Sequence, residues 1–571
     1  MTRTAPLQVV AVLCLMVGCR SEPGGTSPPG PPVAAARTPH PQQLSTANIA
    51  DPKTFNPILS TDMASQIAIG DLFDSLVRLN PKTLEMDPFV AERWEHNADG
   101  TEWTFFLRHD VRWSDDEPLT AADVVFTFDA IYDDRVPNSY KYTLMIDGKR
   151  IAVEALDPYT VRFHLPRPFA PFLDSISVPI IPKHILGESL ATGTFTQQWG
   201  IDTPPERLIG SGPYRMVKFV PAQYVQLRRN PDWWMKDEDG HPLPYLEERR
   251  LLIVPNQDTM FLKFLSGETD MHSPRPEEVS DLRSRAAALN IAVEETGLDT
   301  GTLFVTFNRN PRHYERDGER APQLGWFTDV RFLRALAHSI DKESIINNCL
   351  FGFGQAAVAD ISPENKIFHN PNLTDYGYDL DTARQLLREA GYVNRDGVLY
   401  DSAGNPVEFS LNTNAGNQMR EKICSILKED WSKLGIRVNY RPLDFGLLVE
   451  KLDTTFDWDA ILIGFTGSPE PNNGANLLRS NGNLHMWNPN QATPATPWEA
   501  EIDRLVDAGV LEIDTEKRRP IYWRIQEILY EQLPMIQTVR AKQFTAYKDS
   551  LADYAPNVWG IYRPELMHFS E

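Results

Sequence analysis

Hydrophobic side chains recur along the chain at two spacings, one typical of helices and one typical of strands. The segment DLDTARQLLREAGY, residues 379–392, carries an apolar stripe at i, i+3, i+4 and i+7 that predicts an amphipathic helix: Ala383, Leu386, Leu387 and Ala390. We expect Asp381 to cap the start of this helix and Gly391 to end it.

Two more segments predict helices with defined ends. In residues 119–131, Thr120 and Asp123 have the spacing of a capping box. An apolar helical face follows this box: Val124, Phe128 and Ile131. In residues 420–440 an apolar stripe stops at Gly435, and the residues after it alternate between apolar and polar as in a half-buried strand. Helix, glycine and strand form one α/β unit there.

Short runs rich in β-branched and aromatic residues predict strands from one end of the chain to the other. These runs are residues 101–108, 223–229, 248–255, 303–308 and 458–465. Strands and helices alternate without a repeat period, which favours mixed α/β layers over a solenoid or a propeller. Their scatter fits two lobes, each with its own sheet, better than one continuous sheet.

The length of 571 residues exceeds what one hydrophobic core normally supports, so we expect two or three packed units that move relative to one another. A cleft between such units is a natural place for a ligand. The 56 Lys and Arg against 78 Asp and Glu give a formal charge of -22, and this argues against nucleic acid as a partner, since phosphate binding needs a basic face.

The first residues predict export from the cytoplasm. An apolar run at residues 7–17 follows Arg3 and is too short to span a bilayer, so we interpret residues 1–18 as a signal peptide. The run ends in Gly18 and Cys19, which resembles a lipobox, and we expect Cys19 to carry a lipid. Plain secretory cleavage is the alternative. Residues 19–43, rich in Pro and Gly, are then the lipidated Cys and a flexible tether.

Two cysteines remain once Cys14 leaves with the signal peptide and Cys19 is lipidated. Cys349 lies near the end of one predicted helix and Cys424 lies inside another. They form either one disulfide bridge or two separate buried thiols.

The sequence offers no motif for catalysis. It lacks the P-loop, H-E-x-x-H, C-x-x-C and G-x-S-x-G patterns, and its 12 histidines are dispersed with no two at i, i+4. We therefore expect no catalytic residue, no metal ligand and no cofactor. A secreted lipoprotein hydrolase stays open as an alternative, because catalytic triads are assembled in space rather than in sequence.

Several stretches carry motifs that belong together. Residues 87–128 contain Ala-Glu-x-Trp, an Asp-Gly turn, Leu-Arg and Thr-Ala-x-Asp in that order. Residues 210–234 contain Gly-x-Gly-Pro-Tyr and then Arg-Asn-Pro before two aromatics, and residues 262–271 contain Gly-Glu-x-Asp. FNRNP at 307–311 and the segments after it follow in the same order. Together they resemble the bacterial extracellular solute-binding proteins of family 5, which serve oligopeptide, dipeptide and nickel importers.

The resemblance runs from about residue 44 to residue 571 and implies an α/β, two-lobed periplasmic-binding-protein-like fold with a hinge and an additional third domain. It also implies the boundaries: lobe I from 44–79, 195–301 and 536–571, the additional domain from 80–194, and lobe II from 302–535.

The function that this resemblance implies is that of a monomeric, non-enzymatic substrate-binding protein of an ABC importer, in the periplasm or on the outer face of the cell membrane. Lobe closure would capture a peptide or another extended polar solute for the permease transmembrane subunits. Oligosaccharides, opines and metal chelates stay open as alternative cargoes. An oligosaccharide would need stacking aromatics in the cleft, for which the candidates are Trp233, Trp234, Trp487 and Trp498.

The resemblance also implies which residues line the ligand site between the lobes: Asp62, Met63, Phe304, Phe465, Thr466, Ser468 and Glu470. In peptide-binding members an Asp that pairs with the ligand's free amine occupies the position of Ser468. A neutral serine cannot give that charge-assisted bond. Glu470, two residues further along, is then the carboxylate that we expect to bind an amine. The alternative interpretation is that Glu470 is a solvated side chain on a turn bounded by prolines.

Overall fold

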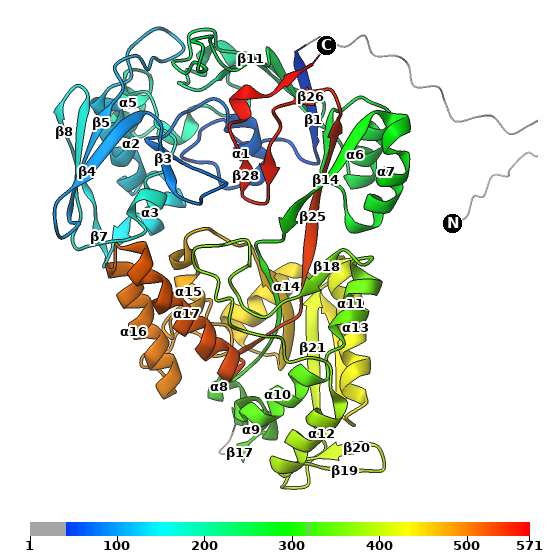
Figure 1. Cartoon of the computed structure of the whole chain (residues 1–571). Helices are drawn as coiled ribbons and strands as arrows, with labels where there is room; N and C mark the ends of the chain where they lie inside the picture. The colour runs from blue at the N-terminus through cyan, green and yellow to red at the C-terminus, as the bar shows by residue number, and fades with distance from the viewer. Residues whose placement is uncertain (1–41, 317–318, 571) are drawn as a thin grey trace, which may run out of the picture. The chain divides into compact units, whose positions relative to one another are not determined.

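The computed structural model describes residues 42–316 and 319–570. The expected signal peptide, Cys19 and nearly all of the tether lie outside the described residues. Figure 1 shows several small sheets of mixed topology with helices packed against them. This is the mixed α/β arrangement that the two hydrophobic spacings predict.

One sheet joins the start of the described chain to its middle. Its strand order is β1 (Gln43–Asn48), β12 (Glu248–Ile253), β11 (Tyr224–Arg229) and β10 (Tyr214–Val220). β1 runs parallel to β12, and the other two pairings are antiparallel. The strands predicted at 223–229 and 248–255 are confirmed.

A second sheet is wholly antiparallel, with the order β4 (Ala91–His96), β5 (Glu102–Leu107), β9 (Thr160–His164) and β8 (Ala152–Asp157). Helix α2 (Ala121–Tyr132) packs against β8 and β9. The predicted capping box is confirmed, because the Asp123 carboxylate accepts the backbone N–H of Thr120 at 2.9 Å. The predicted apolar face is buried in the core: Val124, Phe128 and Ile131.

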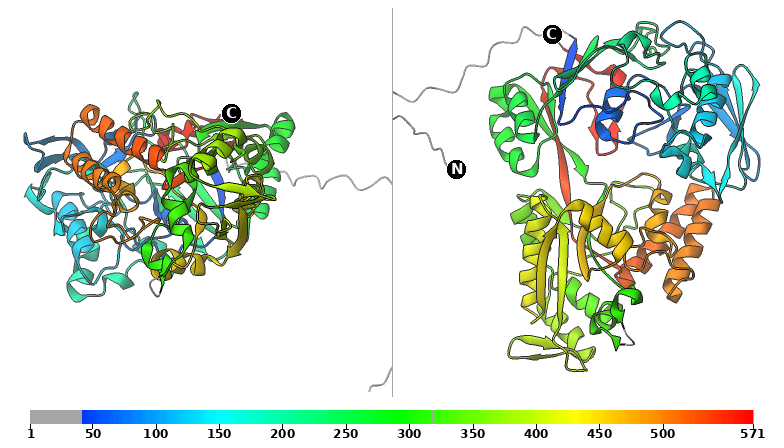
Figure 2. Two further views of the ribbon diagram at one scale, coloured as in Figure 1. Left: turned by 90° about the horizontal axis from the view of Figure 1, so that it is seen from below. Right: turned by 180° about the vertical axis from the view of Figure 1, so that it is seen from behind.

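The third sheet has five strands in the order β22 (Arg437–Leu443), β21 (Glu408–Asn414), β23 (Ala460–Phe465), β15 (Thr302–Phe307) and β24 (Met535–Gln537). α13 (Gln418–Ser432) packs along β21 and β22, as the view from behind in Figure 2 shows. Gly435 has φ +88°, a conformation that favours glycine, so the predicted helix stop is confirmed.

The helix predicted at 381–391 is present as α12 (Leu380–Glu389), but the prediction that Asp381 is its N-cap is wrong. Asp379, not Asp381, accepts the backbone N–H groups of Asp381 and Thr382, both at 3.0 Å. Both aspartates precede the same apolar stripe, and an N-cap must itself stand outside the helix, which Asp379 does with its extended backbone.

The chain crosses twice between the third sheet and a neighbouring one. β14 (Ile291–Leu298) leads into β15, and β24 leads into the long strand β25 (Val539–Lys548), which pairs with β14. Arg540 lies at the start of β25, beside the second crossing, and its guanidinium donates to backbone carbonyls of the first crossing, Asp299 and Gly301, and of the loop that contains Ala359 and Asp360. The two crossings are therefore tied together by one buried side chain.

The two described cysteines are separate thiols. Cys349 ends α11 (Lys342–Cys349), Cys424 lies in α13, and both are buried and free. The bridge that the sequence left open is not formed. Burial raises the pKa of both thiols, so they are stable as neutral, packed side chains.

Candidate functional site

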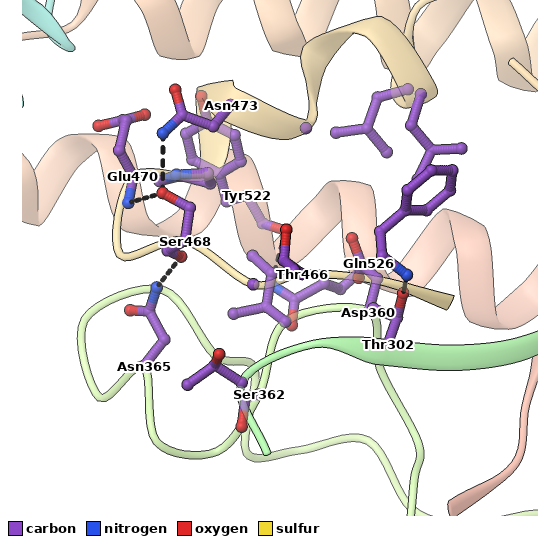
Figure 3. A pocket seen from close by; sticks show the side chains of 18 of the residues that line it. Thr302, Asp360, Ser362, Asn365, Thr466, Ser468, Glu470, Asn473, Tyr522 and Gln526 are labelled. Carbon is purple, nitrogen blue, oxygen red and sulfur yellow. Dashed lines mark hydrogen bonds between the residues drawn. The ribbon is translucent and has the colours of Figure 1, made fainter. Parts of the chain in front are cut away.

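A cavity of about 380 Å³ lies where β23 ends, beside the start of β15. Its lining comes from the loop after β23, from the loop at residues 360–365, from α17 (Thr515–Gln532) and from Trp559 near the C-terminus. Figure 3 shows the side chains gathered around it. Four of the residues expected at the ligand site line this cavity: Phe465, Thr466, Ser468 and Glu470.

The loop after β23 is held in a fixed path by its own polar groups. The hydroxyl oxygen of Ser468 accepts from the side-chain amide of Asn473 at 2.8 Å and from the backbone N–H of Glu470 at 3.2 Å. A Cβ at Gly467 would lie 2.1 Å from the carbonyl oxygen of Thr300, so only glycine fits there. The loop therefore presents its side chains from a rigid support.

Glu470 lines the cavity, but its carboxylate is paired and is neither free nor solvated. Its two oxygens accept from the guanidinium of Arg518 at 2.7 and 2.6 Å, and one of them also accepts the backbone N–H of Asn472. The side chain is buried. The charge of Glu470 is already matched by a bidentate partner from α17, so an incoming ammonium would have to displace Arg518.

Phe304 is also placed differently from the expectation. Its side chain is fully buried in β15 and packs on the ring of Phe465, with 6.0 Å between the ring centroids. Successive side chains of a strand point to opposite faces, and Phe304 points into the core. Phe304 supports Phe465 rather than lining the cavity.

Asp62 and Met63 lie at the start of α1 (Met63–Ile69) and do not line the cavity at the end of β23. Asp62 is the N-cap of this helix and accepts the backbone N–H of Ser65 at 2.9 Å. Met63 is 69% exposed. These positions give Asp62 a structural role and leave Met63 as an exposed apolar side chain next to it.

Sequence reasoning missed several residues that line the cavity: Asp360, Asn365, Tyr522, Gln526 and Trp559. They come from irregular loops and from α17, far apart in the sequence, and no motif marks them. The indole N–H of Trp559 donates to the carbonyl oxygen of Glu364 at 3.1 Å, which joins the C-terminal segment to the loop at residues 360–365.

A second cavity of about 240 Å³ shares Phe465 and Thr466 with the first. Arg420, from the first turn of α13, lines it and donates to the side-chain oxygen of Asn414 at 2.9 Å. Its Nε is shielded from solvent and has no hydrogen-bond partner among the described residues. A guanidinium that lines a cavity fits a carboxylate.

The tryptophans considered for sugar stacking do not line the first cavity. Trp233 and Trp234 both donate their indole N–H to Asp74 at 3.0 Å. Trp487 is fully buried, and Trp498 packs against it with 6.1 Å between centroids. The aromatic side chains that do line it are Phe465, Tyr522 and Trp559. The oligosaccharide alternative thus loses the residues on which it depended.

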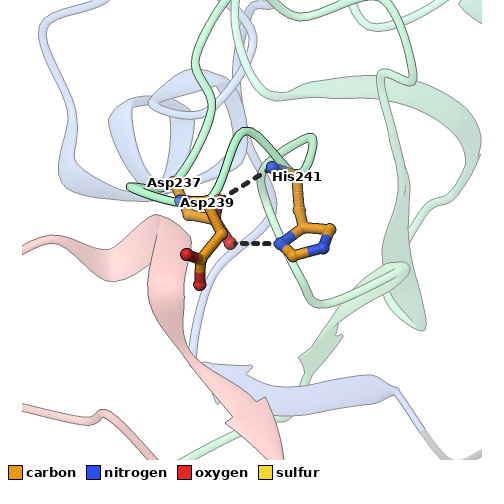
Figure 4. A group of neighbouring side chains, drawn as sticks. All are labelled: Asp237, Asp239 and His241. Atoms are coloured by element: carbon orange, nitrogen blue, oxygen red, sulfur yellow. Dashed lines mark hydrogen bonds and ion pairs between the residues drawn. The ribbon is translucent and has the colours of Figure 1, made fainter.

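One group of three side chains in the described residues brings potential metal-ligating atoms within 4.8 Å of one another: Asp237, Asp239 and His241. Figure 4 shows that they share one tight turn. The Asp237 carboxylate accepts the backbone N–H groups of Asp239 and His241 and the hydroxyl of Tyr245. These bonds explain the cluster as the support of a turn.

Among residues 42–316 and 319–570, no helix combines the length and the hydrophobicity needed to traverse a bilayer.

The small mixed sheets, the paired crossings and the cavity beside them define a periplasmic-binding-protein-like fold built to hold a solute. The profile of the family "Bacterial extracellular solute-binding proteins, family 5 Middle" matches residues 85–485. The chain belongs to this family of extracellular solute-binding proteins.

Individual relatives are similar over nearly their whole length. The chain is 28% identical to the "Probable ABC transporter-binding protein" of Deinococcus radiodurans, over 88% of this chain and 87% of the relative. It is 26% identical to the oligopeptide-binding protein AppA of Bacillus subtilis, over 90% and 89%. The structure of NikA from Brucella suis in complex with Fe(III)-EDTA superposes with a TM-score of 0.76 at 21% identity, covering 92% of this chain and 100% of that one.

Proposed function

We propose that this protein is the substrate-binding component of an ABC importer, and that it captures a peptide or a similar extended polar solute and delivers it to the permease. The observation that carries the proposal is the cavity at the end of β23, where rigid polar loop groups and three aromatic side chains converge beside the two chain crossings. The names of the relatives, several of them peptide-binding proteins, support the same class of cargo.

The division into moving parts is also a proposal. Lobe I would comprise residues 44–79, 195–301 and 536–571, lobe II residues 302–535, and residues 80–194 the additional domain. The crossings at residues 299–301 and 538 would then act as a hinge. Contacts between the segments include polar ones, such as the bond from Trp559 to Glu364 and the bond from Asn473 to Asp174 at 3.4 Å. They also include the apolar side chain of Val510, which is buried in a cluster otherwise formed by residues 55–227. Such contacts can form and break as the lobes move.

We expect the protein to retain its cargo and to become more compact when it binds. Native mass spectrometry of protein purified from a bacterial periplasm without denaturation should show a bound mass that fragments as a peptide. Solution scattering on the cargo-free protein should then show a smaller radius of gyration when that peptide is added, because a cleft gains contacts on both sides only when it closes. A bound mass without peptide bonds, or an unchanged radius at saturation, would contradict the proposal.

We further propose that Cys19 anchors the protein through a lipid. The support is the apolar run at residues 7–17, the Gly18-Cys19 pair and the Pro-rich spacer after it. The variant Cys19→Ala should appear in the soluble fraction after membrane sedimentation, whereas Cys14→Ala, which changes a cysteine inside the apolar run, should remain with the membrane. Equal sedimentation of Cys19→Ala and the parent protein would refute lipid anchoring.

A further inference from the structure

Residues 510–513, where α16 (Pro497–Leu511) ends and the chain turns into α17, pack against residues 80–194. Val510 is 3% exposed and lies in a core cluster whose other described members all come from residues 55–227. Its carbonyl oxygen also accepts the backbone N–H of Ala170 at 2.7 Å. An apolar side chain and a backbone hydrogen bond therefore hold the end of α16 on this part of the chain.

Ile513 extends the same contact. A Cβ at Gly100 would lie 1.9 Å from Cδ1 of Ile513, so the Ile513 side chain rests directly on the turn between β4 and β5. The indole N–H of Trp103 donates to the carbonyl oxygen of Gly100 at 2.9 Å and fixes this turn. We call residues 510–513 the connector, and the turn at Gly100 together with the loop at Ala170 the seat.

The connector is coupled to the loop that lines the first cavity. Nε of Arg518 donates to the carbonyl oxygen of Gly509, directly before the connector, at 2.6 Å, and the same guanidinium pairs with Glu470 in the cavity lining. Three residues after Glu470 in this loop, the side-chain amide of Asn473 (Figure 3) donates to the Asp174 carboxylate at 3.4 Å. Residues 80–194 thus touch both the connector and the loop after β23.

We propose that residues 80–194 act as a clasp, whose seat receives the connector when the lobes close and so keeps part of the cargo-free protein closed. This inference rests on the proposed function and division, under which the seat belongs to the additional domain and the connector to lobe II. Burying the aliphatic side chains of Val510 and Ile513 is favourable without any cargo. A larger closed fraction raises the apparent affinity for a cargo that binds the closed state.

Permanent packing is the competing explanation, in which the connector never leaves the seat. The small extent of the contact speaks against it. Within the described residues, Val510 is the only buried member of its cluster from outside residues 55–227, and Ile513 is half-buried. Among the described strands, the second sheet consists only of β4, β5, β9 and β8, so strand pairing does not join it to lobe II. A contact of this size can open and form again.

The test replaces the aliphatic side chains of the connector by serine and follows the cargo-free protein by solution scattering. Val510→Ser and Ile513→Ser should each show a larger radius of gyration than the parent protein, because serine gains little from an apolar seat. A peptide selected by native mass spectrometry from a random library of tri- to octapeptides should bind each variant roughly 3- to 10-fold more weakly in calorimetric titration. Saturation with this peptide should bring the variants and the parent to the same radius.

The control is Leu511→Ser, which removes an aliphatic side chain from the same connector. Leu511 lies between the two tested positions in the sequence, but it is 41% exposed, so this variant should keep the radius and the affinity of the parent. Should Val510→Ser fail to fold, Ile513→Ser carries the test, because its side chain is only half-buried.

The outcomes separate the clasp from the proposed function. Variants that unfold at lower urea concentrations than the parent, yet keep its radius and its affinity, would show that the packing is permanent and would refute the clasp. If no library peptide binds the parent protein, the peptide function falls. The radii of the cargo-free parent and variants still decide on the clasp in that case: larger radii for Val510→Ser and Ile513→Ser support it, and equal radii overturn it.

Discussion

Replacing Asp74 with Asn is expected to stabilise the protein at pH 8 and to flatten the decrease of its stability between about pH 4 and pH 7. Asp74 is 1% exposed. One carboxylate oxygen accepts the indole N–H groups of Trp233 and Trp234, both at 3.0 Å. Burial raises the pKa of Asp74 to about 7, although the two indoles and Arg78 favour the ionised form.

The direction of the effect follows from the protons bound in each state. Between the unfolded pKa near 4 and the folded value of about 7, the folded state keeps a proton on Asp74 that the unfolded state loses. Stability is therefore full below this window and falls as the pH rises through it, by up to roughly 4 kcal/mol. Asparagine keeps an oxygen acceptor for both indoles and carries no titrating group. The free energy of unfolding of the variant therefore does not decrease through titration at this position.

The measurement is urea unfolding of the parent and of Asp74→Asn at pH 5, 6, 7 and 8. The exposed residue Asp110 provides the control, since Asp110→Asn removes the same charge without changing a buried site and should follow the parent. The slope will not vanish entirely, because burial also raises the pKa of Asp174 to about 6, and this group titrates in the same window. Parallel stability curves for the parent and Asp74→Asn would contradict the prediction.

The sequence predicts those helices, strands and turns that are determined by residues close together in the chain. The apolar stripe of α13 and the positive φ of Gly435 depend on residues within a few positions of one another, and both are confirmed. The cap of α12 was misassigned because Asp379 and Asp381 offer the same chemistry two residues apart. Local patterns thus fix the presence of an element better than the residue at which it begins.

The candidate site could be predicted only where a contiguous loop forms it. The segment from Phe465 to Glu470 lines the cavity because β23 ends there and Gly467 lets the loop approach Thr300. Arg518, the ion-pair partner of Glu470, lies 48 residues further along the chain in α17, and no sequence pattern indicates this pairing. Asp360 and Trp559 reach the cavity through tertiary contacts as well. Whether a carboxylate is free or already paired is a property of the folded chain.

Breaking the pair between Glu470 and Arg518 is expected to destabilise the protein by about 3 to 5 kcal/mol, because either single change leaves an unmatched charge in the interior. Both side chains are buried, with 9% and 5% of their surface exposed. Arg518 also donates through Nε to the carbonyl oxygen of Gly509 at 2.6 Å, so the pair joins the loop after β23 to the junction of α16 (Pro497–Leu511) and α17. Glu470→Gln should therefore unfold at a lower urea concentration than the parent protein.

A matched control lies on the same helix. Glu516 binds Arg519 in an equally bidentate way, with both distances at 2.7 Å, but 73% of the Glu516 side chain is exposed. Glu516→Gln should therefore lower the free energy of unfolding by less than about 1 kcal/mol.

The double variant Glu470→Gln with Arg518→Met removes both buried charges. It should recover much of the stability that either single change removes. The measurement is urea unfolding of Glu470→Gln, Arg518→Met, the double variant and Glu516→Gln, each compared with the parent protein. If Glu470→Gln unfolds like the parent, the buried ion pair does not stabilise the fold, and the prediction is contradicted.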